Sequence, residues 1–387
     1  MKKLLALALA TTVALAASPV VSSAAFRTVI PKTGSTCSPL GKTQVVGAKK
    51  FTCVKSGKKL VWNKPTTIAK PTPTPSPVAQ PTLDLLDAKA VYDFSRASIT
   101  EAILKNGSSP LALKYLVGAN VSSQTVDDVK ADMRRAMDLW GPIFSSTDRL
   151  TVIWYVQQDL EWAANTYKSE SGNPIEWSNI NAGCTINYCG NATATKSQNG
   201  SFVFEQGMTL DRNGWNKSTG GHEFTHLAQN KLAGQNINKI PLWLLEGGAQ
   251  FYGEATGYFP ADSSKAIRRG MHGQLAQDAA SIVSVNFQNK GLREVLSAGQ
   301  ASSAVQLMKI TEFGAWDSSR TALAYLLGSY ASEVLVAAYG HEKLVELYKS
   351  FEVSSDWEVN FQKVYGLSTT SFYEKLAPYF LQMKDEL

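Results

Sequence analysis

Apolar residues follow strand periods in some stretches of the chain and a helix period in others. Residues 149–157, RLTVIWYVQ, form a nearly continuous apolar run rich in β-branched and aromatic residues, which predicts a buried strand. Residues 201–207, SFVFEQG, alternate and end at a glycine, which predicts a second strand that we expect at a sheet edge. Between residues 125 and 144 the apolar positions have helical spacing: Val126, Val129, Met133, Met137 and Trp140.

From residue 321 onward the pattern is helical. Four helices are expected there, with the boundaries 321–340, 341–351, 356–366 and 371–383. Gly340 would end the first, and a capping box of Ser371 and Glu374 would open the last. A few strands followed by many helices favour an α+β domain.

The N-terminus has the pattern of a secretory signal peptide. MKKLLALALATTVALAA places two lysines before a short apolar run, and the small residues 22–25 predict cleavage that removes residues 1–25. Cleavage after Ala17 and an uncleaved anchor are the alternatives, and Pro19 disfavours an anchor because it breaks the run. We expect no transmembrane segment after cleavage, and a secreted, extracellular or envelope-associated protein.

A proline-rich stretch separates two parts of the chain. Residues 64–82, KPTTIAKPTPTPSPVAQPT, favour an extended, semi-rigid spacer between a module at 26–63 and a body at 83–387. In the module, apolar residues alternate with lysines between glycines, which predicts short hairpins in a small β-rich unit. It resembles a short cysteine-containing element of secreted bacterial proteins, which implies a bacterial source.

Charge is distributed unevenly between these two parts. Residues 26–83 contain ten basic residues and no acid, whereas residues from 84 onward contain 26 basic and all 32 acidic residues. The net charge of +6 therefore describes neither part. The module is a candidate binder of an anionic cell-envelope polymer, and a solvated lysine-rich spacer domain is the alternative. We expect no nucleic-acid partner.

The four cysteines fall into two close pairs. Local pairing predicts the disulfides Cys37–Cys53 and Cys184–Cys189, although four cysteines permit three pairings and buried free thiols are an alternative. Export to an oxidising compartment would allow both bonds to form. The first would staple the small module, and the second would tighten the loop CTINYC.

Two of the four histidines lie in the sequence GGHEFTHLAQ at residues 220–229. His222 and His226 are one helical turn apart on one face, and Glu223 stands beside the first. A catalytic zinc site takes three protein ligands and keeps one open position, so a third ligand is needed. Glu246, one turn into a helix that Pro241 opens, is the candidate.

Two glycines follow Glu246, although glycine is a poor helix former. We expect Gly247 and Gly248 to allow this second helix to approach the helix of His222 and His226. An amphipathic helix whose two histidines bind no metal is the alternative to the metal site.

HEFTH, followed twenty residues later by a glutamate, resembles the gluzincin metallopeptidases of the thermolysin-like clan. PLWLLEGGAQFYGE is similar to the W-L-x-E-G-x-A-x-Y signature of the peptidase MA-like branch. The resemblance covers most of residues 120–380 and implies a zincin-like fold, a small sheet followed by a mainly helical part. It also implies Zn²⁺ on His222, His226 and Glu246, with Glu223 as general base.

Two further roles follow from the resemblance. Thermolysin carries an aspartate that orients a histidine ligand, and here that position is Gln250, so we expect Gln250 or Glu254 to take this role. The family also uses a histidine or tyrosine to stabilise the oxyanion. Tyr330 is our first candidate, with His341 and His272 as alternatives, and a core position is the other explanation of Tyr330.

The sequence therefore predicts a secreted zinc peptidase. A catalytically inactive zinc-binding surface or scaffold protein and a hydrolase of cell-wall peptide amide bonds are the alternatives. We expect an extended peptide to pair along the strand at 201–207, beside a loop shaped by Cys184–Cys189. The C-terminal KDEL is interpreted as a charged helix end and not as a retention signal.

Overall fold

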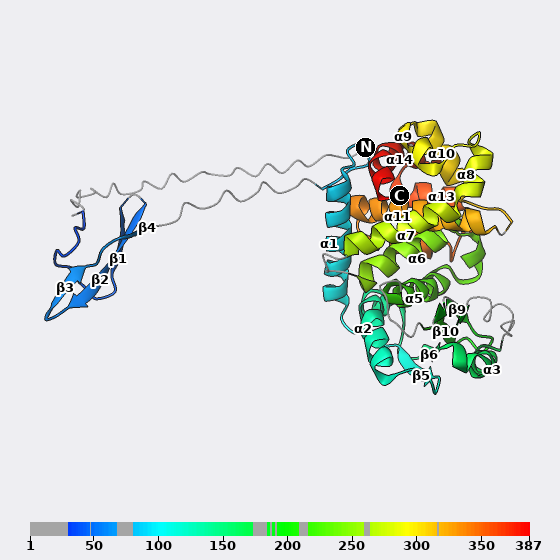
Figure 1. The fold of residues 1–387 in the computed structure, drawn as a ribbon, viewed down its shortest axis with the longest axis horizontal. Coiled ribbons are helices and arrows are strands. Elements are labelled where there is room, and N and C mark those ends of the chain that lie inside the picture. Colours follow the sequence, from blue (N-terminus) through cyan, green and yellow to red (C-terminus); the bar gives the residue numbers. More distant parts are fainter. Residues whose placement is uncertain are drawn as a thin grey trace, which may run out of the picture. The chain divides into compact units, whose positions relative to one another are not determined.

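The computed structural model describes the following residues: 30–46, 48–67, 80–172, 184–185, 188–189, 192–208, 216–258, 264–315 and 317–387. The expected signal peptide at 1–25 and most of the expected spacer lie outside the described residues. The chain divides into two compact units, Met1–Pro77 and Val78–Leu387, each described by itself below (Figure 1).

The first unit is a small antiparallel sheet. Its strands are β1 (Thr43–Val46), β2 (Lys49–Ser56), β3 (Lys59–Trp62) and β4 (Thr66–Thr67), and β2 pairs with each of the others. Phe51, Cys53 and Trp62 form its buried core, and the Cys37–Cys53 disulfide is present as predicted. The predicted β-rich, disulfide-bonded module is confirmed, and β4 extends it into the expected spacer.

The second unit is α+β, as predicted, and 61% of the residues that the structure describes are helical. Its main sheet has the order β5–β6–β10–β9: β5 (Ala112–Val117), β6 (Arg149–Tyr155), β10 (Phe202–Gly207) and β9 (Ala192–Lys196). The first three are parallel and β9 is antiparallel. A hairpin of β7 (Cys184–Thr185) and β8 (Tyr188–Cys189) carries the second predicted disulfide.

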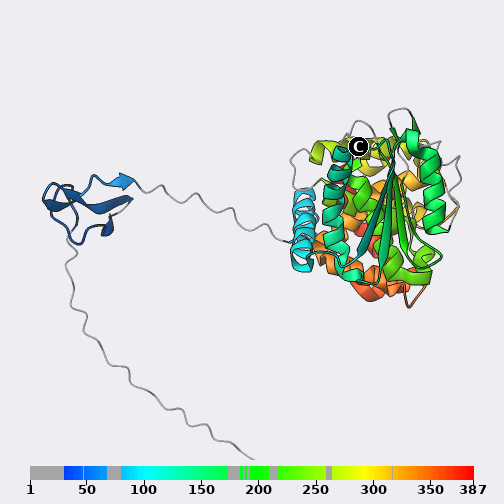
Figure 2. The same ribbon diagram turned by 90° about the horizontal axis from the view of Figure 1, so that it is seen from below.

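Helices make up most of this unit, and Figure 2 shows those of its C-terminal half behind the strands. The α-helices are α1 (Ala88–Asn106), α2 (Ser123–Trp140), α3 (Leu160–Ser171), α5 (Asn216–Ala233), α6 (Leu242–Gly257), α7 (Ser264–Asp278), α8 (Ala280–Asn286), α9 (Leu292–Ser297), α10 (Ala301–Ile310), α11 (Ser318–Tyr339), α12 (His341–Ser350), α13 (Trp357–Tyr365) and α14 (Thr369–Met383). Short 3-10 helices are η1 (Gly141–Ile143), η2 (Gln157–Asp159), η3 (Gly234–Lys239) and η4 (Lys384–Glu386).

The prediction that residues 201–207 form an edge strand is wrong. β10 lies between β6 and β9, and all six of its residues are buried. Successive side chains of β10 point to opposite faces of the sheet, and both faces are covered, because α5 packs on one and α3 on the other. The edge of the described sheet on this side is β9, a short strand without an apolar pattern.

Two predicted helix ends can be compared with the structure. α11 ends at Tyr339, and Gly340 follows it with φ of 85°, a conformation that favours glycine. α14 begins at Thr369, and the Ser368 side chain accepts a hydrogen bond from the Ser371 backbone N–H. The predicted cap at Ser371 is therefore wrong, because Ser368 offers the same N-cap chemistry one turn earlier.

α11 is the central helix of the second unit. By length and composition it is the one helix among the described residues that could span a membrane, which contradicts our expectation that no later segment is long and apolar enough. However, 83% of its most apolar window is buried, since it packs against α6, α1 and α7. A core helix buried on all sides is apolar all round, so its composition alone resembles that of a membrane span.

Candidate metal site

Three potential ligands from α5 and α6 meet at one point. His222 and His226 lie one turn apart on α5, and their Nε2 atoms are 3.0 Å from each other. The Oε2 atom of Glu246, from the second turn of α6, lies 3.5 Å from the first Nε2 and 3.2 Å from the second. The structure thus brings together the three residues that the sequence predicts as metal ligands.

The spacing of these atoms fits a single tetrahedral ion. Ligand atoms about 2.0–2.1 Å from zinc in a tetrahedral arrangement are about 3.4 Å apart, close to the separations of 3.0, 3.2 and 3.5 Å found here. Oε2 of Glu246 is also buried, and no hydrogen-bond partner is found for it among the described residues. Buried carboxylate oxygens ordinarily have a partner, so this atom is suited to a metal ligand.

The backbones of α6 and α5 are in direct contact at Gly253. A β-carbon on Gly253 would lie 2.6 Å from the Ser218 carbonyl oxygen and 3.1 Å from Cβ of His222, and a side chain is therefore excluded. Gly247 serves a different contact, because its β-carbon would lie 2.6 Å from the Ala324 carbonyl oxygen on α11. The expectation that Gly247 faces the histidine helix is wrong, since α6 turns that residue towards α11.

Gln229 orients one of the histidines, a role that we did not predict. Its Oε1 lies 2.8 Å from Nδ1 of His226, while its Nε2 donates to the Leu245 carbonyl oxygen at 2.9 Å and to the Tyr348 hydroxyl at 3.1 Å. Because Oε1 can only accept, Nδ1 of His226 carries the proton and Nε2 presents its lone pair to the site. The signal was available in the sequence, as residues 226 and 229 share one helix face.

Gln250 and Glu254, the expected orienting residues, are directed at His272. The Gln250 amide donates to Oε1 of Glu254 at 2.9 Å, and the same oxygen lies 3.0 Å from Nε2 of His272. Burial would raise the pKa of Glu254, but His272 and Arg268 lower it to about 2. The pair thus belongs to a buried ionic cluster along α6 and α7.

Tyr330 lies in this same cluster. It is fully buried, and its hydroxyl is 2.9 Å from Nδ1 of His272. Tyr325 is the tyrosine at the ligand group: its ring stacks on His222 with centroids 5.2 Å apart and an interplanar angle of 6°, and its hydroxyl is hydrogen bonded to Glu246. The sequence pattern did not indicate which face of α11 points to the site.

His341, the remaining oxyanion candidate, is also buried. Its Nδ1 lies 2.8 Å from the Tyr252 hydroxyl, and its ring packs on Trp140. Burial lowers its pKa to about 3, so the imidazole is neutral at pH 7. The histidine therefore belongs to the packing between α2, α6 and α12.

Glu223 lies beside the three ligand residues and is almost completely buried. It is 7% exposed, and its carboxylate accepts a hydrogen bond from the Ala194 backbone N–H on β9. Burial raises the pKa of Glu223, the two histidines oppose this rise, and Glu246 adds to it. A carboxylate with a raised pKa is a better proton acceptor than an exposed one, which suits general-base chemistry.

A second buried carboxylate lies on the other side of the sheet. Burial raises the pKa of Glu205 on β10 to about 7; the neighbouring Tyr155 and Thr193 side chains oppose this rise, and the charge of Glu223 adds to it. This acidic neighbour of the site was not predicted.

Comparisons with known proteins add no family assignment. No protein-family model matches the chain, and neither a curated protein nor a solved structure matches it. The chemistry of the site therefore has to be argued from its own geometry.

Proposed function

We propose that the second unit is a zincin-like metallopeptidase domain of the gluzincin type, which hydrolyses peptide bonds. The observation that carries this proposal is the meeting of two imidazole nitrogens and one carboxylate oxygen within 3.5 Å, with a buried glutamate beside them. Two histidines and a glutamate form a ligand set used by catalytic zinc.

A zinc ion on these ligands would supply Lewis-acid activation of water and of the peptide carbonyl. Glu223 accepts the proton of the attacking water and passes it to the leaving amine. Its burial keeps its pKa raised, which favours acceptance of the proton from water. Gln229 keeps Nε2 of His226 free to bind metal.

Tyr325 is the proposed oxyanion donor in place of Tyr330. Burial and the neighbouring Glu246 and Glu223 charges raise the pKa of its phenol well above the usual value, so the group stays an O–H donor at working pH. A neutral donor aimed at the site stabilises charge that develops on the substrate oxygen.

β9 is the proposed peptide-binding edge. An extended substrate can pair with an edge strand through backbone hydrogen bonds, and Glu223 already lies against Ala194 of this strand. A peptide bound there lies next to the general base. This arrangement favours a peptide or protein substrate.

The metal proposal is tested with three forms of the full chain: wild type, Glu246→Ala and Glu223→Gln. We expect one zinc per wild-type chain, loss of zinc from Glu246→Ala, and full zinc but no hydrolysis in Glu223→Gln. The zinc content is measured by atomic absorption, and hydrolysis is measured with casein as the substrate. Unchanged zinc in Glu246→Ala would refute the third ligand.

The same experiment separates the competing functions. Zinc without cleavage of casein or peptidoglycan by the wild type would favour an inactive binding protein, and cleavage of peptidoglycan alone would favour a cell-wall amide hydrolase. Retained turnover in Glu223→Gln would exclude Glu223 as the base.

We also propose that the first unit attaches the protein to an anionic cell-envelope polymer. The lysines that the structure describes in this unit are exposed, among them Lys49, Lys50 and Lys55 of β2, and no acid lies in the sequence from residue 26 to 83. The two disulfides support an oxidising location outside the cytoplasm.

A further inference from the structure

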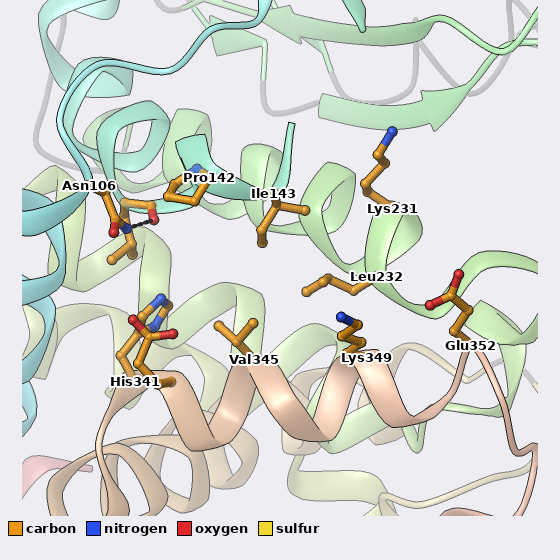
Figure 3. Close-up of a pocket in the computed structure, with 11 residues that line it drawn as sticks. Asn106, Pro142, Ile143, Lys231, Leu232, His341, Val345, Lys349 and Glu352 are labelled. Atoms are coloured by element: carbon orange, nitrogen blue, oxygen red, sulfur yellow. Dashed lines mark hydrogen bonds between the residues drawn. The ribbon is translucent and has the colours of Figure 1, made fainter. Parts of the chain in front are cut away.

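A cavity of about 370 Å³ lies away from the three ligand residues, between the C-terminal ends of α1, α2 and α5 and the face of α12. A volume of this size lies within the range of small-molecule sites. Figure 3 shows Asn106 and His341 at one end, Ile143, Leu232 and Val345 in the middle, and Lys231, Lys349 and Glu352 at the other end.

The His341 end presents a hydrogen-bond donor. The buried Tyr252 hydroxyl must donate its proton, and the only acceptor found for it in the described part of the chain is Nδ1 of His341 at 2.8 Å. Because the imidazole is neutral, its own proton is then on Nε2. No described group is hydrogen bonded to Nε2, and His341 lines the cavity.

Asn106 supplies an acceptor at the same end. One of its two amide protons is used, since Nδ2 donates to the Leu139 carbonyl oxygen at 2.8 Å, and Oδ1 accepts no hydrogen bond from the described residues. Beyond these two groups the wall is apolar, formed by Leu139, Pro142, Ile143, Leu232 and Val345, apart from Glu342. The carboxylate of Glu342 is largely exposed and lies 3.5 Å from Nζ of Lys105, so its charge is paired.

Charge at the far end is mixed. Lys231 is paired with Asp148 at 2.8 Å, whereas Lys349 and Glu352 form no ion pair in the described part of the chain. Their opposite charges give the rim no strong preference for one sign. Selection is therefore left to the donor and acceptor at the His341 end and to the apolar middle.

We propose that this cavity binds a small apolar molecule that carries an uncharged amide head group. The amide carbonyl accepts from Nε2 of His341, its N–H donates to Oδ1 of Asn106, and the apolar body lies along Ile143, Leu232 and Val345. A carboxylate has no proton to donate to the Asn106 oxygen, so two acceptors would face each other there. An ammonium has no lone pair to accept from the His341 N–H, so two donors would face each other. The site therefore selects an amide over both.

The cavity is lined by one ligand-bearing helix, α5, and is linked to the other, α6, through His341. Leu232 is on α5, and His341 is bonded to Tyr252 on α6. Trp140, which packs on His341, donates to the Thr225 hydroxyl at 3.1 Å, next to His226 on α5. The proposal concerns binding alone and is independent of the proposed peptidase activity.

Binding is tested by ligand-observed NMR and calorimetry on the full chain with N-acetyl-leucinamide as the probe. We expect saturable one-to-one binding to the wild type, at least tenfold tighter than that of isovalerate or isoamylamine, since one lost hydrogen bond is worth about tenfold. Val345→Trp fills the apolar middle and should abolish binding. Asn106→Leu removes the acceptor and should weaken binding about tenfold.

Val353→Trp is the matched control, because Val353 is 88% exposed just beyond α12 and does not line the cavity. It should bind the probe as the wild type does, and circular dichroism should show all variants folded. Absence of saturable binding, equal binding by Val345→Trp, or a preference for the carboxylate or the amine would overturn the proposal.

Discussion

Tyr325 and Tyr330 lie five residues apart on α11 and have different partners. Five residues rotate a helix by about 140°, so the two side chains leave opposite sides of it. The first is hydrogen bonded to Glu246 and stacked on His222, and the second is bonded to His272. The two phenols therefore have separable roles, one in the site and one in the core.

Removing each hydroxyl separates these roles. Tyr325→Phe should lower kcat by about 10²-fold with a small change in KM, because loss of one oxyanion donor has that cost. Tyr330→Phe should keep kcat within about twofold but lower the free energy of unfolding by about 1–2 kcal/mol, since it leaves a buried partner unsatisfied. Steady-state kinetics and urea unfolding measure the two effects, and the reverse pattern would restore Tyr330 as the donor.

Glu205 gives the fold a pH dependence of definite sign. Its pKa is raised from 4.5 to about 7, so folding favours the protonated carboxyl. The associated stability is fully present below pH 4.5 and is lost as pH rises through 7, about 3 kcal/mol in all. Glu205→Gln, which keeps the shape without the charge, should unfold at higher urea than wild type at pH 8 and show no such gain at pH 4.

Glu161→Gln on the exposed side of α3 is the control for that variant, and should follow the wild type at both pH values. An identical pH dependence in wild type and Glu205→Gln would show that Glu205 does not titrate in this range.

Two glycine contacts set the positions of three helices. Gly253 of α6 lies against α5 next to His222, and Gly247 of the same helix lies against Gly328 of α11. Both contacts involve backbone atoms, which cannot rotate away as a side chain can. The geometry of the three ligands thus depends on residues that have no side chain.

Gly253→Ala should move α6 from α5 by a few tenths of an ångström. We expect the zinc affinity to fall at least tenfold and the free energy of unfolding to fall by about 1–3 kcal/mol, the usual cost of overpacking. Gly270→Ala on α7 is the control, because a β-carbon at this position would have no atom within 4 Å. This substitution should raise the free energy of unfolding by about 0.5–1 kcal/mol. Zinc titration with a competing chelator decides the result, and unchanged affinity in Gly253→Ala would contradict it.

At the scale of the whole molecule, each of the two units has its own core. Three residues, Phe51, Cys53 and Trp62, form the core of the first, and the second has a large continuous one. In the second unit, KDEL lies in the final turn, where Glu386 is 3.3 Å from Nε of Arg268. The C-terminal segment is thus part of the ionic cluster around Glu254 and His272.

Because the cores are separate, the second unit should not need the first. A specific protease site inserted after Pro73 and then cleaved should leave the melting temperature and zinc content of the second unit unchanged. Differential scanning calorimetry before and after cleavage measures this, with uncleaved protein of the same sequence as control. A fall of its melting transition by several degrees would show that the units stabilise each other.

The sequence alone determined several features that depend on neighbouring residues. Helical spacing places His222 and His226 on one face wherever the helix lies. The apolar run at 149–157 predicts a buried strand whether its neighbours are parallel or antiparallel. The two cysteine pairs are close enough in sequence to form local disulfides. The α+β class follows from counting such elements.

Tertiary structure decided what depends on residues far apart in sequence. β10 became an interior strand because β9 paired with it, and the rotation of α11 against α6 decided that Tyr325, not Tyr330, lies beside His222 and Glu246. The packing of α6 against α11 brought Gly328 to Gly247, and the contact of α6 with α7 placed His272 beside Glu254. Periodicity gives the faces of an element, whereas only packing between elements decides which face meets which partner.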